Sequence, residues 1–445
     1  MAARTGVEDA LIIEAARLFA SGPKGTAITG TGPEMGAHPN LTQHLVSSLN
    51  IVCGRFYRAG DRLPNPGMLS PPSPKVAQVA DVAVAWGRGE RCRVRPDLGE
   101  LVTPGRLGPS REMPTAQLAD EILTPGEGQV KALFVIAGNP IMAWPDQEKA
   151  LAAMKDLELL VCIDPYISAT AELADYVLAP KLTLEREDVT LLSDAWYEKP
   201  YSQYSRAVIE SEHDVIEEWE LYWAIADRMN LEINIGRSVI PNQPKPEKFD
   251  VLKAITNGSR VDLDWLRDKP GGHIFEDVVS EVQPGPEGSV SKLKLYPDGV
   301  EEEFAELRAE PGLNADFPHL LIGFRSKYVL NSFGHNLPAL KKKSGTTNPA
   351  HLHPADLAAL GIDDDDEVQI ASAHGQISAI VKADAKIKPG VIAMHHCWGL
   401  SPDKQGSVRE NGANTNLLVS SETDIQRYTG MTRSSSIPVR IKKSA

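Results

Sequence analysis

Residues 131–180 read KALFVIAGNPIMAWPDQEKALAAMKDLELLVCIDPYISATAELADYVLAP and carry the clearest fold signal of the chain. Two apolar runs, Ala132–Ala137 and Leu157–Ile163, each end in turn-forming residues, Gly138-Asn139-Pro140 and Asp164-Pro165. Short apolar runs separated by a helix-like segment, here Asp146–Lys155, are typical of parallel strands covered on both faces. Ligands bind beyond the carboxyl ends of such strands. We therefore predict an α/β fold in which the two turns border a nucleotide-type crevice.

The composition of the chain excludes two classes of partner. The 445 residues carry a net charge of −14, which argues against binding to the phosphate backbone of a nucleic acid. No apolar run reaches the roughly 18 residues that a membrane-spanning helix needs, so we expect no membrane segment.

At about 150 residues per domain, the length indicates two or three domains.

The cysteines indicate a reducing compartment. Cys53, Cys92, Cys162 and Cys397 are far apart, and no CxxC or CxxxC pair is present. We expect them to be reduced and mostly buried, and we expect no metal site made of neighbouring thiolates. The first 22 residues resemble an amphipathic helix and not an export signal. Together these features favour a cytoplasmic protein.

The N-terminal segment predicts a helix over Glu8–Ala20, a short strand over Thr26–Thr29, and a second helix over Asn40–Asn50. The glycine-rich turn Gly30-Thr31-Gly32-Pro33-Glu34-Met35-Gly36 lies between strand and second helix. Glycines allow close backbone approach to a phosphate, so Gly30 and Gly32 are candidate cofactor contacts. The spacing is GxGxxxG and not GxGxxG, so a plain tight turn is the alternative.

The middle of the chain is less regular. Residues 53–125 are rich in Pro, Gly and Arg, and Asn65–Pro74 is not expected to form regular structure. Asp214–Met229 predicts a helix with apolar residues on one face. Residues 231–316 contain short elements separated by Pro and Gly, which indicates an insertion or linker.

From Phe317 onward the pattern is that of short strands. Val368–Ala373 and Gln376–Lys382 flank a two-residue His374-Gly375 turn and predict a hairpin. Pro354–Leu360 predicts a short helix closed by Gly361. Val391–Trp398 and Ile437–Ile441 add strands, so we predict a C-terminal β-barrel. The resulting domains are 1–230 (α/β), 231–316 (insertion or linker) and 317–445 (barrel).

Several segments together resemble one known family. The chain resembles the molybdopterin oxidoreductases of the dimethyl-sulfoxide-reductase superfamily in the segment FVIAGNPIMAWPD and in the later segment LLVCIDPYISATAELADYVLAP. Two earlier segments resemble the preceding part of that family; they are IIEAARLFASGPKGTAITGTGPEMG and CGRFYRAGD. The stretch from His351 to Gly399 and the later Asn414–Leu418 resemble its molybdopterin dinucleotide-binding domain. The resemblance implies a Rossmann-like cofactor domain followed by a double-psi β-barrel.

The resemblance also implies a cofactor and a reaction class. Family members hold molybdenum or tungsten between two molybdopterin guanine dinucleotides, and perform oxygen-atom or proton-coupled electron transfer on a small molecule. An electron-transfer partner subunit is a further expectation. In the family an N-terminal region carries cysteines for a [4Fe-4S] cluster and the residue that ligates the metal. The segments matched here follow that region, so we expect a cluster only if such a region is present.

Cofactor contacts are carried over residue by residue. The resemblance implies contacts in the two turns and the segment after them; these residues are Gly138, Asn139, Pro140, Asp164, Thr170 and Asp175. Asp164 can accept two hydrogen bonds from a guanine or ribose edge, and a helix N-cap is its alternative role. In the barrel, Arg325 can pair with pyrophosphate, and Asn414 and Asn416 can meet pterin or guanine edges.

His353 and His396 are further candidate cofactor contacts, with core hydrogen bonding as the alternative. His395 and His396 alternate along a strand and cannot share one face. No protein ligand of the metal and no catalytic residue is identified. The main hypotheses are the catalytic-subunit portion of a molybdenum oxidoreductase and a non-catalytic cofactor-binding chain that needs a partner for the N-terminal half; a third is a non-redox enzyme on the same scaffold, such as a hydratase.

Overall fold

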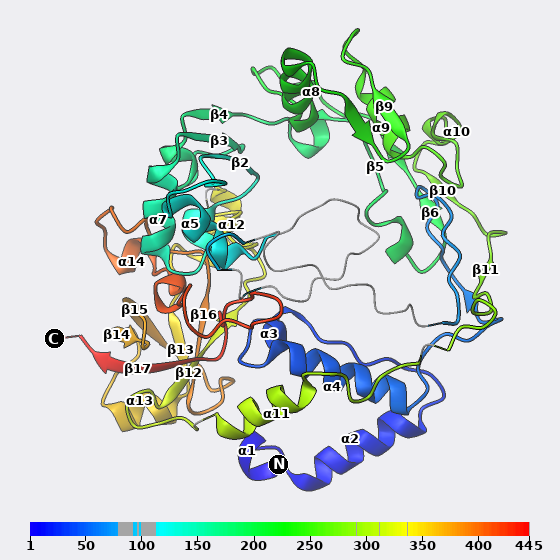
Figure 1. Ribbon diagram of the computed structural model, residues 1–445. Coiled ribbons are helices and arrows are strands. Elements are labelled where there is room, and N and C mark those ends of the chain that lie inside the picture. The colour runs from blue at the N-terminus through cyan, green and yellow to red at the C-terminus, as the bar shows by residue number, and fades with distance from the viewer. Residues whose placement is uncertain are drawn as a thin grey trace.

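A three-stranded parallel sheet and a closed barrel form the two halves that matter for the site (Figure 1). The structure is a computed structural model that describes residues 1–78, 92–95, 98, 113–290, 292–310, 312–335 and 337–444. In Figure 1 the sheet lies above the barrel, and helices of the N-terminal segment lie below. Among the described helices, none has the length and apolarity needed to cross a membrane.

The sheet has the order β2-β3-β4, built from Ala132–Ile136, Leu159–Ile163 and Tyr176–Leu178. Both pairings are parallel, with Phe134 opposite Val161 and Val161 opposite Tyr176. Helix α7 (Gln147–Asp156) makes the crossover between β2 and β3, as the apolar pattern predicted. The apolar side of α7 packs with α5 (Thr115–Leu123) and the sheet in one buried core that includes Ile122, Leu151 and Leu160. The parallel pairing was therefore predicted correctly, while the Rossmann-like type of the domain stays a prediction.

The barrel closes in the order β12-β16-β13-β15-β14-β17. Its strands are β12 (His319–Phe324), β13 (Ala350–Leu352), β14 (Glu367–Ala371), β15 (Gln376–Ala383), β16 (Val391–His395) and β17 (Ile437–Lys443). Inward-facing aliphatic residues such as Leu321, Val368 and Ile392 fill its interior. The predicted barrel is confirmed, while its double-psi type stays a prediction.

Two local features of the barrel follow from single residues. Helix α13 spans Pro354–Leu360 as predicted, because Gly361 adopts φ 66° after its last turn. The predicted two-residue hairpin turn is wrong. The connection between β14 and β15 has four residues, 372–375, because the Ser372 hydroxyl accepts the N–H groups of His374 and Gly375 and draws them out of the ladder.

The N-terminal segment contains α1 (Ala2–Thr5), α2 (Asp9–Ser21), α3 (Thr31–Glu34) and α4 (Pro39–Val52), so both predicted helices are confirmed. The predicted strand at Thr26–Thr29 is wrong. These residues are extended, but no described strand pairs with them. The Asn50 side chain holds them against α4 instead, through hydrogen bonds of 2.8 Å to both the N–H and the carbonyl of Ala27.

The remaining elements include those that carry the chain from the sheet over the top and right side of Figure 1 to α11 (Val300–Ala309) at the bottom and on to the barrel. They are η2 (Ala171–Leu173), η3 (Thr183–Glu185), β5 (Asp188–Val189), η4 (Asp194–Trp196), β6 (Tyr201–Ser202), β7 (Tyr204–Ser205), α8 (Glu218–Met229), β8 (Ile233–Ile235), β9 (Ser238–Ile240), α9 (Lys248–Ile255), α10 (Leu263–Arg267), β10 (His273–Ile274), β11 (Ser280–Glu281) and α11 (Val300–Ala309), with α12 (Pro338–Ser344), α14 (Val408–Asn411) and η5 (Thr415–Leu418) in the barrel half. The predicted helix at Asp214–Met229 is confirmed as α8, which starts four residues later. β10 pairs with β6, and β11 pairs with β1 (Arg62–Leu63), so 231–316 is tied to earlier parts of the chain. The boundaries at 230/231 and 316/317 stay predictions.

The predicted irregular stretch Asn65–Pro74 has no helix or strand, and a buried carboxylate holds it in place. Asp194 Oδ2 accepts the N–H groups of Met68 and Leu69 at 2.7 and 2.6 Å. The Asn65 amide donates to the Asp194 carbonyl at 2.6 Å. Much of the predicted long loop around it, residues 79–91, 96–97 and 99–112, lies outside the described residues.

We expect Asp194→Ala to lower the free energy of unfolding by about 2 to 4 kcal/mol, because it leaves two buried N–H donors without an acceptor. Asp194→Asn, which keeps one side-chain oxygen, should lose less. Urea unfolding followed by tryptophan fluorescence measures both. Equal stability of Asp194→Ala and the wild type would show that this carboxylate does not hold the loop.

Candidate functional site

A cleft of about 390 Å³ lies where the carboxyl ends of β2 and β3 face the barrel half. The sheet contributes two segments to its lining, 137–139 and 164–169. The barrel half contributes Ser332–His335, Cys397 and 399–401. Both predicted turns therefore border one cleft. Its volume is within the range of ordinary small-molecule sites.

The Gly138-Asn139-Pro140 turn is held by a buried threonine. The Thr170 hydroxyl donates to Asn139 Oδ1 at 3.0 Å and accepts the N–H of Ile141 at 3.1 Å. A side chain on Gly138 would lie 3.3 Å from Val135 Cγ1, so the turn is closely packed from behind. These contacts engage Asn139 through its oxygen. The Asn139 amide N–H₂ is the group suited to a ligand in the cleft, and Thr170 positions it.

Asp164 ends β3 in a local turn. Its Oδ1 accepts the N–H of Tyr166 at 2.9 Å, so the carboxylate forms a turn with its own backbone and does not cap a helix. Partial burial raises the pKa of Asp164, and the hydrogen bonds from Tyr166 and Ser168 oppose that rise. A carboxylate that is partly desolvated and lines a cleft is suited to accept hydrogen bonds from a ligand.

The opposite wall includes His335, which stacks on Trp398, a residue that does not itself line the cleft; sequence reasoning missed this pair. The rings of His335 and Trp398 stack at 4.1 Å with an interplanar angle of 27°. His335 Nε2 and Trp398 Nε1 are buried, and no described group hydrogen-bonds to either. Burial lowers the pKa of His335, which keeps its imidazole neutral near pH 7. Since buried polar atoms are normally paired, these two nitrogens indicate a partner supplied by a ligand or by water.

A second missed contact spans the mouth of the cleft. The ring of Tyr166, from the turn after β3, meets the ring of Phe333 edge-on at 6.2 Å. Lys404 and Glu172 form an ion pair nearby, again between the two halves.

For the stack of His335 on Trp398, the only signal in the sequence was the position of Gly334-His335 and Trp398-Gly399 among segments already assigned to the barrel. The pairing itself depends on tertiary structure.

Arg325 and His396 lie together beside the cleft. Arg325 Nη1 donates to Asn331 Oδ1 and lies 3.2 Å from His396 Nε2. Burial and the charge of Arg325 lower the pKa of His396, so this imidazole is neutral at pH 7. His395 turns the other way and approaches the carbonyl of Phe324 at 2.8 Å, as the strand alternation predicted. Arg325 is exposed, and neither Arg325 nor His396 is among the residues that line the cleft.

The other predicted contacts are not brought to the cleft. Asp175 lies at the amino ends of β3 and β4, away from the cleft, and its carboxylate accepts a hydrogen bond from the N–H of Leu160 at 2.8 Å. His353 caps α13 by accepting the N–H of Ala355. Gly30 and Gly32 are exposed at α3, and a side chain added at either position would meet no atom within 4 Å. Asp175 and His353 are each engaged by their own backbone neighbourhood, so the structure gives neither a ligand role.

Asn414 and Asn416 join the two halves instead of facing the cleft. Both are buried. Asn414 Oδ1 accepts the N–H of Asn416, and the Asn416 amide donates to the carbonyl of Met142 at 3.0 Å. Met142 belongs to α6 (Pro140–Ala143), directly after the Gly138 turn. These asparagines therefore fix the distance between the barrel half and the sheet edge.

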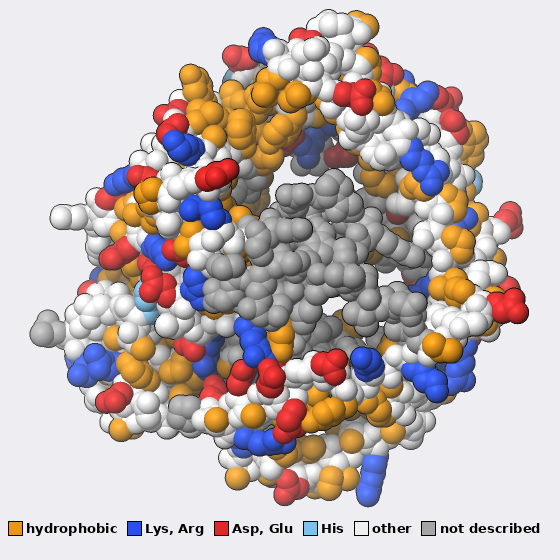
Figure 2. All heavy atoms as spheres, viewed as in Figure 1, with side chains coloured by type: hydrophobic (Ala, Val, Ile, Leu, Met, Phe, Trp, Pro, Cys, Tyr) orange, Lys and Arg blue, Asp and Glu red, His pale blue; other side chains and the backbone are white. Residues whose placement is uncertain are grey.

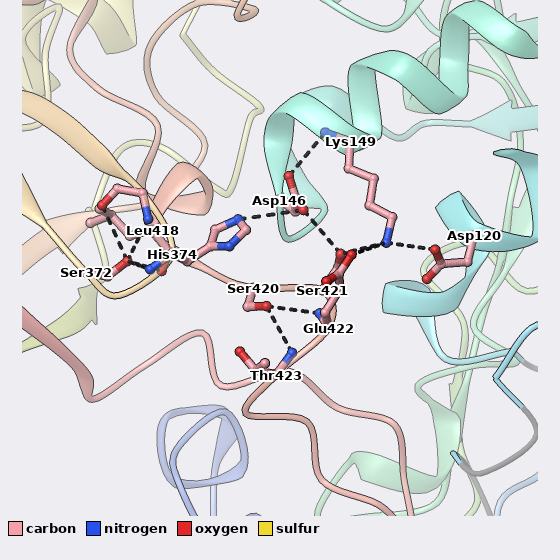
Figure 3. A network of polar contacts seen from close by, with 11 residues as sticks. Asp120, Asp146, Lys149, Ser372, His374, Leu418, Ser420, Ser421, Glu422 and Thr423 are labelled. Carbon is pink, nitrogen blue, oxygen red and sulfur yellow. Dashed lines mark hydrogen bonds and ion pairs between the residues drawn. The ribbon is translucent and has the colours of Figure 1, made fainter.

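A polar network continues this junction (Figure 3). The N–H of Asp146 donates to the carbonyls of Asn416 and Val419 at 3.1 and 2.9 Å. The Asp146 carboxylate accepts a hydrogen bond from the Ser421 hydroxyl at 3.3 Å. His374, from the turn between β14 and β15, approaches the same carboxylate at 3.6 Å. One turn along α7, Lys149 pairs with Asp120 at 2.7 Å and with Glu422 at 3.4 Å.

A larger hollow of about 1030 Å³ lies elsewhere, between α1, α11 and the barrel. Gly36 of the glycine turn reaches it. Arg4, His38 and Arg433 of its lining each lie within 3.9 Å of the Glu310 carboxylate, and Arg427 pairs with Glu302. Glu303 and Glu306 line the same hollow, so carboxylates offset its arginines, and we place the functional site in the smaller cleft, at the carboxyl ends of the parallel strands.

No metal-binding group emerges in the part of the chain that the structure describes, where no three His, Cys, Asp or Glu side chains come together. Cys53, Cys92, Cys162 and Cys397 are all free thiols, and only Cys53 is not fully buried. Burial raises the pKa of Cys162 and of Cys397 to about 11. The expectation of reduced and mostly buried cysteines is confirmed.

Comparison with known proteins gives two family matches. Residues 32–228 match the family model described as molybdopterin oxidoreductase. Residues 320–435 match the model described as molydopterin dinucleotide binding domain.

Individual relatives agree with these matches. Acetylene hydratase of Syntrophotalea acetylenica is 26% identical over 296 residues, which are 62% of this chain and 38% of that protein. Trimethylamine-N-oxide reductase of Haemophilus influenzae is 23% identical over 324 residues, 63% of this chain and 39% of that protein. The chain thus spans about two fifths of the curated relatives it matches. The solved structure of acetylene hydratase from Pelobacter acetylenicus has the same fold, with a TM-score of 0.68 and 20% identity over 100% of this chain and 64% of that chain.

We expect the cysteines to differ sharply in reactivity. At pH 8, iodoacetamide should modify Cys53 first, because the thiolates of Cys162 and Cys397 are about a thousandfold less abundant than their thiols when the pKa is about 11. Raising the pH to 9 should increase the thiolate fraction of both about tenfold. Mass spectrometry of peptides measures each site, and denatured protein provides the fully reactive control. Rapid modification of folded Cys397 at pH 8 would contradict its burial.

Proposed function

We propose that this chain, which belongs to the molybdopterin oxidoreductase family, binds the guanine dinucleotide end of a molybdenum or tungsten pterin cofactor in the cleft between β2–β3 and the barrel. The resemblance read from the motifs is confirmed by the two family matches. One observation carries the proposal. Asn139 and Asp164, at the ends of neighbouring strands, face a barrel wall in which the buried His335 Nε2 has no partner among the described residues.

The polar groups of the cleft fit a guanine nucleotide. Guanine presents two adjacent N–H donors on one edge, and a single carboxylate such as Asp164 can accept both. The amide of Asn139 is positioned by Thr170 to contact the same ligand. The closely packed Gly138 has no side chain that would fill the space beyond β2. We assign guanine recognition to Asp164 and Asn139.

The barrel half supplies the other contacts. Arg325 carries a planar cation beside the cleft and suits a pyrophosphate group. His335 Nε2, which lies in the lining of the cleft, can pair with a polar atom of the ligand. His396 acts through Arg325, which it helps to position. When bound, the cofactor supplies redox chemistry at its metal, while the protein orients it and limits access of water.

The reaction that follows from this proposal is oxygen-atom or proton-coupled electron transfer on a small molecule. The relatives with reductase names support this class. An electron-transfer partner and a cytoplasmic location belong to the same proposal. A [4Fe-4S] cluster enters only with a region that supplies its ligands.

The second candidate is a chain that holds the cofactor without turning over by itself. One observation favours it. Cys397 lines the cleft but is buried in the apolar core beside the sheet, and among the described residues no three His, Cys, Asp or Glu side chains come together. In this candidate the residue that ligates the metal comes from another polypeptide segment. Both candidates share the nucleotide cleft, and they differ only in whether these 445 residues complete the reactive centre.

We expect GMP to bind the purified chain with a dissociation constant on the order of 10 to 100 µM, as measured by isothermal titration calorimetry. Asp164→Ala should weaken binding by about 10- to 100-fold, because two hydrogen bonds to a carboxylate are lost. Asp363→Ala is the matched control, since that carboxylate is 91% exposed on the barrel. AMP, which lacks the paired N–H donors, should bind more weakly than GMP.

The pH dependence of the same measurement identifies the carboxylate. Burial raises the pKa of Asp164, so its proton returns at a higher pH than for an ordinary aspartate as the pH falls. The protonated form cannot accept both guanine hydrogens, so GMP affinity should decrease on acidification. The Asp164→Ala variant should lack this decrease. Equal GMP affinity in wild type and Asp164→Ala would place the nucleotide elsewhere.

Metal content separates the two candidates. Expressed in a host that makes the molybdenum cofactor, the chain alone should contain well under one molybdenum per polypeptide if its metal ligand comes from elsewhere. Elemental analysis of the purified protein measures this ratio. One molybdenum per chain, together with reduction of trimethylamine N-oxide by a dye donor, would establish the oxidoreductase as complete in these residues.

A further inference from the structure

The cleft contains a cation to which the proposed function gives no role. Among the described residues that line the cleft, Lys404 is the one lysine or arginine. Arg325 lies beside the cleft but outside this lining. A nucleotide carries a negatively charged phosphate, which proteins bind through lysine, arginine or backbone N–H groups. Lys404 is therefore the side chain inside the cleft whose charge matches a phosphate.

The loop that carries Lys404 is anchored to the sheet half. The N–H of Lys404 donates to the carbonyl of Ser401 at 2.9 Å, and the Ser401 hydroxyl donates to the Asp403 carboxylate at 2.7 Å. The same carboxylate forms an ion pair with Lys155 of α7 at 2.6 Å. The backbone at Lys404 is thus held in place, while its long side chain remains able to change partner.

The partner of Lys404 in the structure is a carboxylate of the sheet half. Lys404 Nζ forms an ion pair with Glu172, which belongs to η2 and also lines the cleft. The two side chains are 45% and 39% exposed. Ion pairs of this exposure contribute little stability, because water solvates both charges and both long side chains lose conformational freedom. Exchange of Glu172 for a stronger partner therefore costs little.

A phosphate is a stronger partner for Lys404 than Glu172 is. It carries more negative charge and more acceptor oxygens than a carboxylate. Figure 2 shows lysine and arginine side chains interspersed with aspartate and glutamate over one face of the molecule, and the chain carries a net charge of −14. Such a surface does not concentrate anions. Binding of a phosphate therefore depends on a specific cation such as Lys404.

We propose that Lys404 binds the phosphate of the guanine nucleotide, and that Glu172 holds Lys404 at the cleft until the nucleotide replaces it. This assignment rests on the proposed function, since it requires the base to lie at Asp164. The base edge then contacts the sheet half, and the phosphate contacts the barrel half through Lys404. Glu172 competes with the ligand for one ammonium group, so it lowers the affinity of the cleft for nucleotides.

Isothermal titration calorimetry of the full chain with GMP and with guanosine, which lacks the phosphate, tests the assignment. Lys404→Gln should weaken GMP binding by about tenfold, because a charge-assisted contact is lost, and should leave guanosine binding unchanged. Glu172→Gln removes the competing carboxylate. It should strengthen GMP binding by about 2- to 5-fold, which corresponds to the strength of an exposed ion pair, and should also leave guanosine binding unchanged.

Lys131→Gln is the matched control, because it removes the same charge from an exposed ion pair. Lys131 pairs with Glu158 at 2.6 Å beside the amino end of β2, whereas the cleft lies at the carboxyl end. This variant should bind GMP and guanosine as the wild type does. Arg325→Gln should weaken GMP binding less than Lys404→Gln, because Arg325 lies outside the lining of the cleft. Thermal unfolding of each variant shows that the chain is folded.

The direction of the Glu172→Gln effect separates exchange of partners from a purely structural ion pair. If the pair only ties the two halves together, Lys404→Gln and Glu172→Gln both loosen the cleft and weaken the binding of guanosine as well as GMP. That result, or equal GMP affinity of Lys404→Gln and wild type, would overturn the role of Lys404 and leave the guanine site intact. Absence of binding of both GMP and guanosine to the wild type would instead overturn the proposed function, and this assignment with it.

Discussion

The cleft depends on a junction of hydrogen bonds and ion pairs between two lobes of the chain, and Asp146 lies at its centre. Asp146 adopts φ 53°, a conformation that costs most residues about 1 kcal/mol or more but that aspartate tolerates. In this conformation its side chain caps α7 while its N–H reaches the carbonyls of Asn416 and Val419. The start of the crossover helix is thus bound to the barrel half, a few residues after the turn that ends β2. This junction helps to hold the sheet edge against the barrel half, where the Gly138 turn and His335 line the same cleft.

The two lobes contribute unlike chemistry to the shared space. The sheet edge supplies hydrogen-bonding groups fixed by local turns, such as the Asn139 amide behind Thr170. The barrel supplies neutral imidazole and indole rings, whose stacking sets their planes. A nucleotide needs both, because its base edge requires directional acceptors while its phosphates require a cation such as Arg325. A ligand that touches both lobes also stabilises their contact, since it binds only when they are assembled.

Local sequence signals predicted the parts of this structure that local physics determines. The apolar runs around Val135 and Val161 and the glycine after Leu360 required no knowledge of distant residues. The strand at 26–29 failed because a strand needs a partner, and Asn50 substitutes for one here. Asp175 and His353 were plausible ligands by type, but each is satisfied by a nearby backbone N–H. His335 and Trp398 were missed because their stacking joins residues about sixty positions apart. A sequence without an alignment carries no signal for such a pair.

Closure of the barrel has a consequence for the order of events during synthesis. β17 lies at residues 437–443, yet it sits between β12 and β14 and pairs with both. Residues up to 443 must therefore have left the ribosome before the barrel can close, while α7 and the β2–β3 pair can form much earlier. Contacts that join such distant segments are slow to form. In the nascent protein, the barrel wall of the cleft therefore forms after the sheet wall. Until it forms, the apolar strands of the open barrel are accessible to chaperones.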